Sequence, residues 1–149
     1  MKLNHFKVEK LNLKEEEHYV LAKKLERSAK IDYISPHFIT FLEKEQTNNY
    51  VLKDEENHSL GIFGEKPDER DHTTEIWCAL QEGKRNQGIG NHFLGEITKY
   101  LITEKDYSDV KLVIQKQNKA SRKIALENGY QIYRSVDDDK DEFRYFGRK

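Results

Sequence analysis

Apolar residues recur at every fourth position in one stretch of the chain, at Ile89, Phe93, Ile97 and Leu101. Side chains spaced four apart lie on the same face of an α-helix. The spacing therefore predicts a helix over residues 88–104 with one face buried against the rest of the protein.

Two β-prone segments flank this predicted helix. Residues 110–114 form a nearly continuous apolar run, which is typical of a strand covered on both faces. Residues 73–80 precede the helix and also read as a strand. A strand, a helix and a second strand in this order predict a right-handed βαβ unit, whose two strands are parallel neighbours.

Shorter sequence patterns predict the remaining helices, strands and turns of the chain. Ser35 and Pro36 suit the N-cap and the first residue of a helix. Gly129 suits the end of another helix, because glycine adopts the left-handed conformation easily. The acidic segment 137–141 is a predicted turn between the last two strands. The remaining predictions are strands over residues 3–11, 50–52, 60–63, 130–136 and 142–146, and helices over residues 14–29 and 118–128.

Together these elements predict an α+β (α/β-like) fold. We expect a mixed, mostly antiparallel sheet with one parallel strand pair near its middle, flanked by about four helices. The chain has 149 residues and no linker rich in serine or glycine, so residues 1–149 are predicted to form a single domain.

Composition narrows the classes of function. Charged residues make up 36% of the chain, but the net charge is only −1, which argues against binding to a nucleic-acid backbone. Cys78 is the only cysteine, so neither a disulfide framework nor a multi-cysteine zinc site is expected, and the scattered histidines indicate no metal site. The sequence has neither a secretory signal nor a membrane-spanning run, which predicts a cytoplasmic protein without membrane contact.

The polar loop before the predicted helix of residues 88–104 carries the clearest chemical signal. Gly83 and Gly88 have P-loop spacing, but Ile89 and Gly90 replace the required Lys and Ser/Thr, which excludes that motif. A dinucleotide fingerprint fits poorly, because Phe93 replaces its third glycine. Two interpretations stay open: a turn that only caps the helix, or a loop whose backbone amides hold a pyrophosphate at the helix N-terminus.

The second interpretation is supported by a resemblance. Arg85-x-x-Gly88-x-Gly90, followed by Asn118 and, eleven residues later, by Gly129-Tyr130, resembles the signatures of the GNAT superfamily of N-acetyltransferases. The likeness covers residues 73–133. Ser121 and Glu75 are most similar to the branch that contains the ribosomal-protein N-terminal acetyltransferases.

The resemblance implies a splayed central parallel strand pair and a site for acetyl-coenzyme A, used as a cosubstrate without a metal. It implies that backbone groups of the strand hold the pantetheine arm and polarise the thioester, while the loop holds the pyrophosphate. The implied coenzyme-binding residues are Cys78, Ala79, Leu80, Arg85, Asn86, Gln87, Gly88, Ile89, Gly90, Asn118 and Ser121. Asn118 also suits the N-cap of its own helix.

The resemblance further implies roles for catalytic side chains. Glu75 is the expected base that takes a proton from the acceptor amine, although a solvated glutamate at a strand end fits the same pattern. His72 is the second candidate base, with an exposed loop histidine as its alternative.

The expected proton donor is missing from this chain. Many family members carry a tyrosine seven residues after the signature asparagine, where this chain has Ala125. Ser121, one helical turn earlier, is the expected substitute, unless its hydroxyl only lies on the helix surface. Tyr130 and Tyr133 are further candidates.

These observations lead to two expected functions. The first is an acetyl-coenzyme A dependent N-acetyltransferase that acts by direct transfer to a small-molecule, polyamine or peptide amine. The second is a GNAT-like module that binds an acyl-coenzyme A without turnover, which the substitution at Ala125 favours. A homodimer formed through the C-terminal strands is also an expectation from the family.

Overall fold

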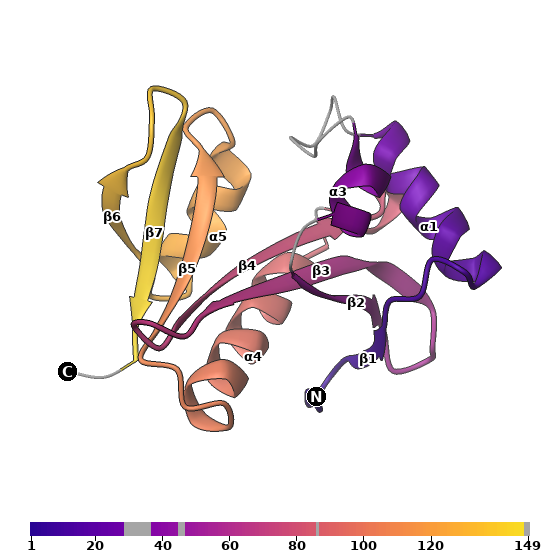
Figure 1. The fold of residues 1–149 in the computed structure, drawn as a ribbon, viewed down its shortest axis with the longest axis horizontal. Helices are drawn as coiled ribbons and strands as arrows, with labels where there is room; N and C mark the ends of the chain where they lie inside the picture. Colours follow the sequence, from indigo (N-terminus) through magenta and orange to yellow (C-terminus); the bar gives the residue numbers. More distant parts are fainter. Residues whose placement is uncertain (29–36, 45–46, 86, 148–149) are drawn as a thin grey trace. The chain divides into compact units, whose positions relative to one another are not determined.

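A computed structural model of the protein describes residues 1–28, 37–44, 47–85 and 87–147. These residues form seven strands, four α-helices and one short 3-10 helix (Figure 1). The strands are β1 (Lys7–Lys10), β2 (Asn48–Lys53), β3 (Ser59–Asp68), β4 (Thr73–Leu80), β5 (Asp109–Gln115), β6 (Gln131–Ser135) and β7 (Lys140–Phe146). The helices are α1 (Glu16–Arg27), α3 (Phe38–Lys44), η1 (Glu82–Lys84), α4 (Ile89–Thr103) and α5 (Lys119–Glu127). The predicted helix start at Ser35 and Pro36 lies outside the described residues.

The strands form one mixed sheet in the order β1-β2-β3-β4-β5-β7-β6. The pairs β1–β2, β2–β3, β5–β7 and β6–β7 are antiparallel, whereas β4 and β5 run parallel. Helix α4 connects β4 to β5, as the apolar spacing predicted. This arrangement confirms the α+β (α/β-like) class with a single parallel pair among the described strands.

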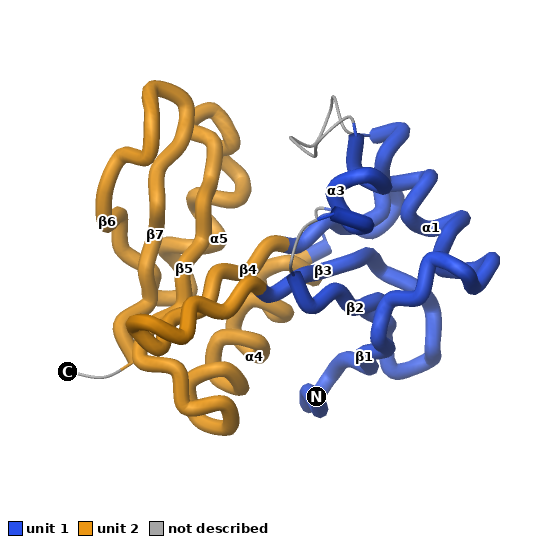
Figure 2. Tube along the Cα trace, in the orientation of Figure 1, with its two compact units in different colours: residues 1–65, 78–87 blue, residues 66–77, 88–149 orange. Residues whose placement is uncertain are grey.

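The chain divides into two compact units (Figure 2). Unit 1 comprises residues 1–65 and 78–87, and unit 2 comprises residues 66–77 and 88–149. Strands β3 and β4 therefore each contribute residues to both units, and each unit has buried apolar side chains of its own.

Unit 1 is built around the apolar stripe of α1. Leu21 and Leu25 recur at helical spacing and are buried, as is Phe38 on α3, which contacts α1. Val51 on β2 and Ile62 on β3 are cross-strand partners and are fully buried. Removing these apolar groups from water supplies most of the free energy that holds the helices on the strands.

A buried ion cluster also ties together β1, α1 and β2 in unit 1. The Lys53 ammonium is buried and pairs with the carboxylates of Glu9 and, at 3.5 Å, Glu17. His18 is buried beside it, and its Nδ1 accepts a hydrogen bond from the backbone N–H of Asn12. A buried ammonium requires such partners, because an unpaired charge is costly away from water.

In unit 2 the two faces of β5 differ sharply, so the prediction that this strand is covered on both faces is wrong. Val110, Leu112 and Ile114 are buried on one face, which we call the helix face. Helix α4 contacts β5, and the Arg122 guanidinium of α5 lies 5.1 Å from the ring centroid of Phe143, the cross-strand partner of Leu112. The opposite face, which we call the open face, carries the intervening residues of β5 and their cross-strand partners.

The end of α5 follows the predicted pattern. Gly129 has a φ of 86°, in the left-handed region that favours glycine. Tyr130 follows and is almost completely buried, with its hydroxyl 2.6 Å from the Thr98 hydroxyl of α4. This hydrogen bond fixes the aromatic ring between the two helices of unit 2.

Element boundaries differ from the sequence-based predictions mainly at loops and edges. The first strand is confined to Lys7–Lys10, whereas β3 extends to Asp68 and includes Pro67. The turn between β2 and β3 is fixed by the Asp54 carboxylate, which accepts backbone hydrogen bonds from Glu56 and His58. Among the described helices, none has both the length and the apolar character needed to cross a bilayer.

Candidate active site

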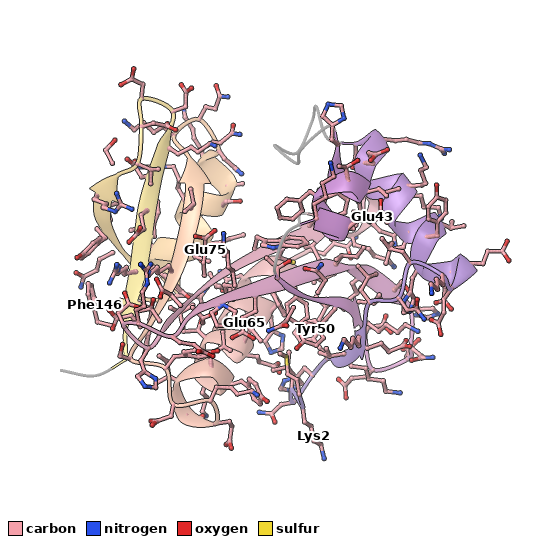
Figure 3. The ribbon with its side chains drawn as sticks, viewed as in Figure 1. Lys2, Glu43, Tyr50, Glu65, Glu75 and Phe146 are labelled. Atoms are coloured by element: carbon pink, nitrogen blue, oxygen red, sulfur yellow. The ribbon has the colours of Figure 1, made fainter. Side chains whose placement is uncertain are left out.

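Glu75 lies where the parallel ladder between β4 and β5 ends. The register pairs Thr73 with Asp109, Thr74 with Val110 and Glu75 with Lys111, and goes no further. Both strands continue beyond that pair, to Leu80 and Gln115. The last ladder position thus places the Glu75 side chain on the open face of unit 2, on the strand where Figure 3 labels it.

The Glu75 carboxylate is half-buried and has no ion-pair partner within 4 Å among the described residues. Burial raises its pKa above the usual value for a glutamate, and Glu142 adds to the rise. The nearby charges of Lys66 and Lys111 partly oppose this shift. A carboxylate in this state can accept a proton at neutral pH and is not neutralised by a neighbour.

The N-terminus of α4 has backbone N–H groups that can donate hydrogen bonds, and they lie next to the unoccupied space beside Gly88. Gly88 is the N-cap with a φ of 76°, and a Cβ placed there would have no other atom within 4 Å. The amides of Ile89, Gly90 and Asn91 begin the helix and have no carbonyl partner within it. The backbone conformation therefore favours glycine at this position, and the space beside it is free for an anionic group.

The Arg85 side chain stabilises the loop instead of extending from it. Its Nε and Nη2 donate to the Leu80 carbonyl oxygen at 3.1 and 2.9 Å, and Nη2 also donates to the Ser28 hydroxyl at 3.2 Å. Gln87 similarly donates its amide to the carbonyl of Gly83 at 2.9 Å. Arg85 and Gln87 thus hold the loop together, and Asn86 between them lies outside the described residues.

The last three residues of β4, Cys78, Ala79 and Leu80, differ in exposure and in their contacts. The Cys78 side chain reaches solvent, yet the protein atoms that crowd it raise the pKa of its thiol to about 12. The thiol is therefore protonated at neutral pH and is a poor nucleophile. Ala79 is buried against Gly61 of β3, and the Leu80 carbonyl oxygen is already occupied by Arg85.

Asn118 and Ser121 lie together at the start of α5. The Asn118 side-chain oxygen accepts a hydrogen bond from the Ser121 backbone N–H at 3.2 Å, so Asn118 is the N-cap of the helix. Ser121 is partly exposed, whereas Ala125, one turn later, is fully buried. Ser121 is therefore partly accessible at the start of α5, whereas Ala125 is not.

A comparison of the chain with protein-family models identifies its family. Residues 5–131 match the model of the acetyltransferase (GNAT) domain. The chain belongs to the GNAT acetyltransferase family. A comparison with curated protein sequences found no match.

Solved GNAT structures share this fold at low sequence identity. A GNAT-family acetyltransferase from Bacillus anthracis matches with a TM-score of 0.81 and 15% identity, over 99% of this chain and 98% of that chain. Spermidine N-acetyltransferase from Vibrio cholerae, solved in complex with CoA and spermine, matches with a TM-score of 0.76 and 9% identity over 96% of each chain. Ribosomal-protein-S5-alanine acetyltransferase from Vibrio fischeri gives a TM-score of 0.72 and 10% identity, over 100% of this chain and 97% of that chain.

The other candidate residues of this GNAT chain, Tyr130, Tyr133 and His72, differ in their burial and contacts. The Tyr130 hydroxyl is hydrogen-bonded to Thr98 in the core, and burial raises its pKa well above the usual value for a tyrosine. Tyr133 is exposed on β6, under the Arg144 guanidinium at 4.0 Å from the ring centroid. His72 lies in the exposed turn before β4, with a φ of 58°.

Sequence reasoning missed the charged residues that surround Glu75. Lys111 is its register partner on β5, and Glu142 on β7 is buried with its carboxylate held by Arg134 and Arg144. In the sequence Glu142 follows an acidic turn and resembles an ordinary solvated acid. Only strand register could have revealed these neighbours, because their spacing along the chain carries no signal.

Proposed function

We propose that this GNAT protein is an N-acetyltransferase that transfers the acetyl group of acetyl-CoA to a primary amine of a small molecule, a polyamine or a peptide. The observation that carries the proposal is Glu75, a half-buried carboxylate without an ion-pair partner among the described residues, located at the last pair of the β4–β5 ladder. Membership of the family and the CoA-bound spermidine N-acetyltransferase structure support the choice of donor.

The N-terminus of α4 fits the pyrophosphate of such a donor. The free amides of its first turn, the positive end of the helix dipole and the open space at Gly88 all suit a bound anion. The proposed coenzyme-binding set is that of the motif: Cys78, Ala79, Leu80, Arg85, Asn86, Gln87, Gly88, Ile89, Gly90, Asn118 and Ser121. Within it, Arg85 and Gln87 act by holding the loop that contains Gly88.

Glu75 is proposed to act as the general base. A lysine-like ammonium has a pKa of about 10.4 and must lose a proton before its nitrogen can attack. Acetyl-CoA supplies a thioester whose C–S bond breaks as the new amide C–N bond forms. The proton leaves the amine for the Glu75 carboxylate, and the transfer is direct, within one complex of enzyme, donor and acceptor.

The departing thiolate needs a proton in return. Ser121 is the proposed donor or hydrogen-bond partner, because this residue is partly exposed while Ala125 occupies the usual tyrosine position. A serine hydroxyl is a weak acid, so water supplies the proton through Ser121 in this proposal. The buried hydroxyl of Tyr130 is unsuited to the role.

We further propose that residues 1–149 act as a single acetyltransferase domain in the cytoplasm, without a metal. In this proposal the protein binds neither nucleic acid nor a membrane, and it forms a homodimer through its C-terminal strands. The nearly balanced charge of the chain supports the proposal that it does not bind nucleic acid.

A second candidate function is a GNAT-like module that binds acyl-CoA without turnover. Two observations favour it: Ala125 replaces the usual tyrosine, and the Asn118 side-chain oxygen is used to cap α5. Such a module would retain the amides at the N-terminus of α4 and would need no proton donor.

Two measurements distinguish these functions. Acetyl-CoA at a hundredfold excess over its Kd should stabilise the protein by about 2.7 kcal/mol in either case. Thiol release from acetyl-CoA should then be measured with small amines, polyamines and peptides. Turnover that depends on the amine supports the acetyltransferase, and a thermal shift without any turnover supports the binding module. The absence of a thermal shift contradicts both.

A further inference from the structure

The Lys111 ammonium is paired with Asp71 and not with Glu75, its neighbour in the sheet. Glu75 on β4 and Lys111 on β5 are register partners in the parallel ladder, so both side chains lie on the open face at neighbouring positions. Opposite charges at such positions attract each other. Nζ of Lys111 nevertheless lies 3.7 Å from Oδ2 of Asp71, and Glu75 forms no ion pair with any residue that the structure describes.

Asp71 is fixed in the turn before β4 by its other carboxylate oxygen. Oδ1 of Asp71 accepts a hydrogen bond from the Thr73 hydroxyl at 2.6 Å and another from the Thr73 backbone N–H at 3.3 Å. Thr73 itself is buried. These hydrogen bonds lower the pKa of Asp71, so its carboxylate is ionised at neutral pH and attracts the ammonium of Lys111.

The turn that carries Asp71 is also tied to the start of β5. The Ser108 hydroxyl donates to the backbone carbonyl oxygens of Asp71 and His72 at 3.3 and 3.2 Å, and the Ser108 N–H donates to the carbonyl of His72 at 2.8 Å. His72 has a φ of 58°, a backbone conformation that persists only where surrounding contacts hold it and that recurs beside active sites. Asp71 is thus held near the strand that carries Lys111.

The remaining charges around Glu75 leave it ionisable but not neutralised. Lys66 on β3 opposes the pKa rise that burial causes, Glu142 on β7 adds to the rise, and Lys111 opposes it less than Lys66 does. A register partner has this small effect because its ammonium is directed to Asp71. The other charged groups of the neighbouring segments are paired with one another: Asp68 with Arg70, Asp109 with Arg144, and Glu142 with Arg134 and Arg144.

We infer that Asp71 is a positioning residue for the base Glu75, an inference that rests on the proposed N-acetyltransferase function. By holding the Lys111 ammonium in the turn before β4, Asp71 prevents an ion pair between Lys111 and Glu75 and leaves the Glu75 carboxylate free to take the proton of the amine. Such an ion pair would favour the ionised carboxylate and make it a weaker base. Asp71 acts only through Lys111 and does not touch the substrate.

Asp71→Asn tests this role, because asparagine can still accept both hydrogen bonds from Thr73 but has no charge to hold Lys111. Carbon-13 NMR titration of the Glu75 carboxyl group, assigned by its loss in Glu75→Gln, measures the pKa of Glu75 without any need for turnover. In Asp71→Asn this pKa should fall by about 0.5–1 pH unit, since the released ammonium can approach Glu75. In Lys111→Met, adding Asp71→Asn should produce no such fall.

Asp68→Asn is the matched control. It removes the same charge from the adjoining end of β3, but the Asp68 carboxylate pairs with Arg70 at 3.1 Å and not with Lys111. The pKa of Glu75 should change much less in this variant than in Asp71→Asn. An equal fall in both variants would show that only the loss of a negative charge matters, and it would overturn the inference.

The same variants are then compared by kcat from pH 5 to pH 9, with saturating acetyl-CoA and one accepted amine. In Asp71→Asn the acid limb of the profile should move to lower pH by the amount that the titration measures. The rate on the plateau should fall about two- to threefold, as expected for a weaker base. A role of Asp71 in folding alone would lower kcat at every pH without moving the acid limb.

The outcomes separate this inference from the proposed function. An unchanged pKa of Glu75 in Asp71→Asn overturns the inference, as does a fall that persists when Lys111 is replaced by methionine. A lowered pKa with an unmoved acid limb also overturns it. In these cases the parent still acetylates the amine, and the proposed function stands. No turnover by the parent with any amine overturns the proposed function, and the catalytic role of Asp71 with it.

Discussion

Glu75 is the register partner of Lys111 at the last pair of the parallel β4–β5 ladder, yet no ion pair joins the two side chains. The Nζ atom of Lys111 instead lies 3.7 Å from the Oδ2 atom of Asp71. The carboxylate is therefore partly desolvated without a neutralising contact, which raises its pKa. This is an energetically costly arrangement for a structural residue, and it is useful for a base.

The first prediction concerns the stability of Glu75→Gln. Because the pKa of Glu75 is raised in the folded state, the group favours folding at pH below its unfolded pKa of about 4.3 and disfavours it once ionised. The variant should therefore melt higher than the parent at pH 7, by roughly 1–3 °C, and the difference should shrink below pH 4. Melting temperatures measured from pH 3 to pH 8 check this. A lower melting temperature at pH 7 would contradict it.

The second prediction concerns Gly88→Ala. A φ of 76° is strained for alanine, so the variant should lose about 1–2 kcal/mol of stability and bind acetyl-CoA more weakly. Gly83→Ala is the control, since Gly83 also has open space around it but no positive φ. Calorimetric titration with acetyl-CoA and chemical unfolding of both variants check this. Unchanged affinity in Gly88→Ala would argue against the α4 N-terminus as the anion site.

The third prediction concerns Tyr130→Phe. Loss of the hydroxyl leaves the buried Thr98 hydroxyl without its partner and should cost about 1–2 kcal/mol. The double variant Thr98→Val/Tyr130→Phe should recover most of that stability, because both polar groups are then removed. Turnover below the melting temperature should stay within about twofold of the parent. A large fall in kcat would instead identify Tyr130 as the proton donor.

The fourth prediction concerns the ion cluster of unit 1. The hydrogen bond to Lys53 lowers the pKa of Glu9, and the same bond raises the pKa of Lys53. The pair therefore stabilises the fold above about pH 4.3 and below about pH 10.4, and this contribution is lost beyond either limit. Lys53→Met should cost about 1–3 kcal/mol at pH 7, since Glu9 is half exposed.

Lys10→Met, which alters an exposed residue of the neighbouring strand, is the control for that prediction. Urea unfolding at pH 3, pH 7 and pH 11 should show the largest difference between Lys53→Met and the parent at pH 7. A difference that is constant across this range would show that the lysine acts through packing alone.

The sequence was most informative where one physical signal dominated. The four-residue apolar spacing of α4 and the apolar run of β5 predicted the βαβ unit, because burial of one face of each element leaves a direct pattern. The left-handed conformation of Gly129 was likewise expected for a glycine at the end of a helix.

The sequence was least informative about side-chain partners. Arg85 could equally extend toward a ligand or hold its own loop, and only the fold shows that it donates to the Leu80 carbonyl. The β6 bulge that brings Arg134 opposite Glu142 on the open face leaves no glycine or proline signal in the strand. Such features depend on register between distant segments, which neither periodicity nor composition encodes.

Thiol release by the parent and by Glu75→Gln, followed from pH 5 to pH 9 with saturating acetyl-CoA and one accepted amine, tests the central claim most directly. The account predicts that the parent loses activity as pH falls through the raised pKa of Glu75, and that the variant is slower mainly below pH 8, where the amine still needs a base. The two rates should approach each other at higher pH. Identical pH profiles in parent and variant would contradict a role for Glu75 as the base.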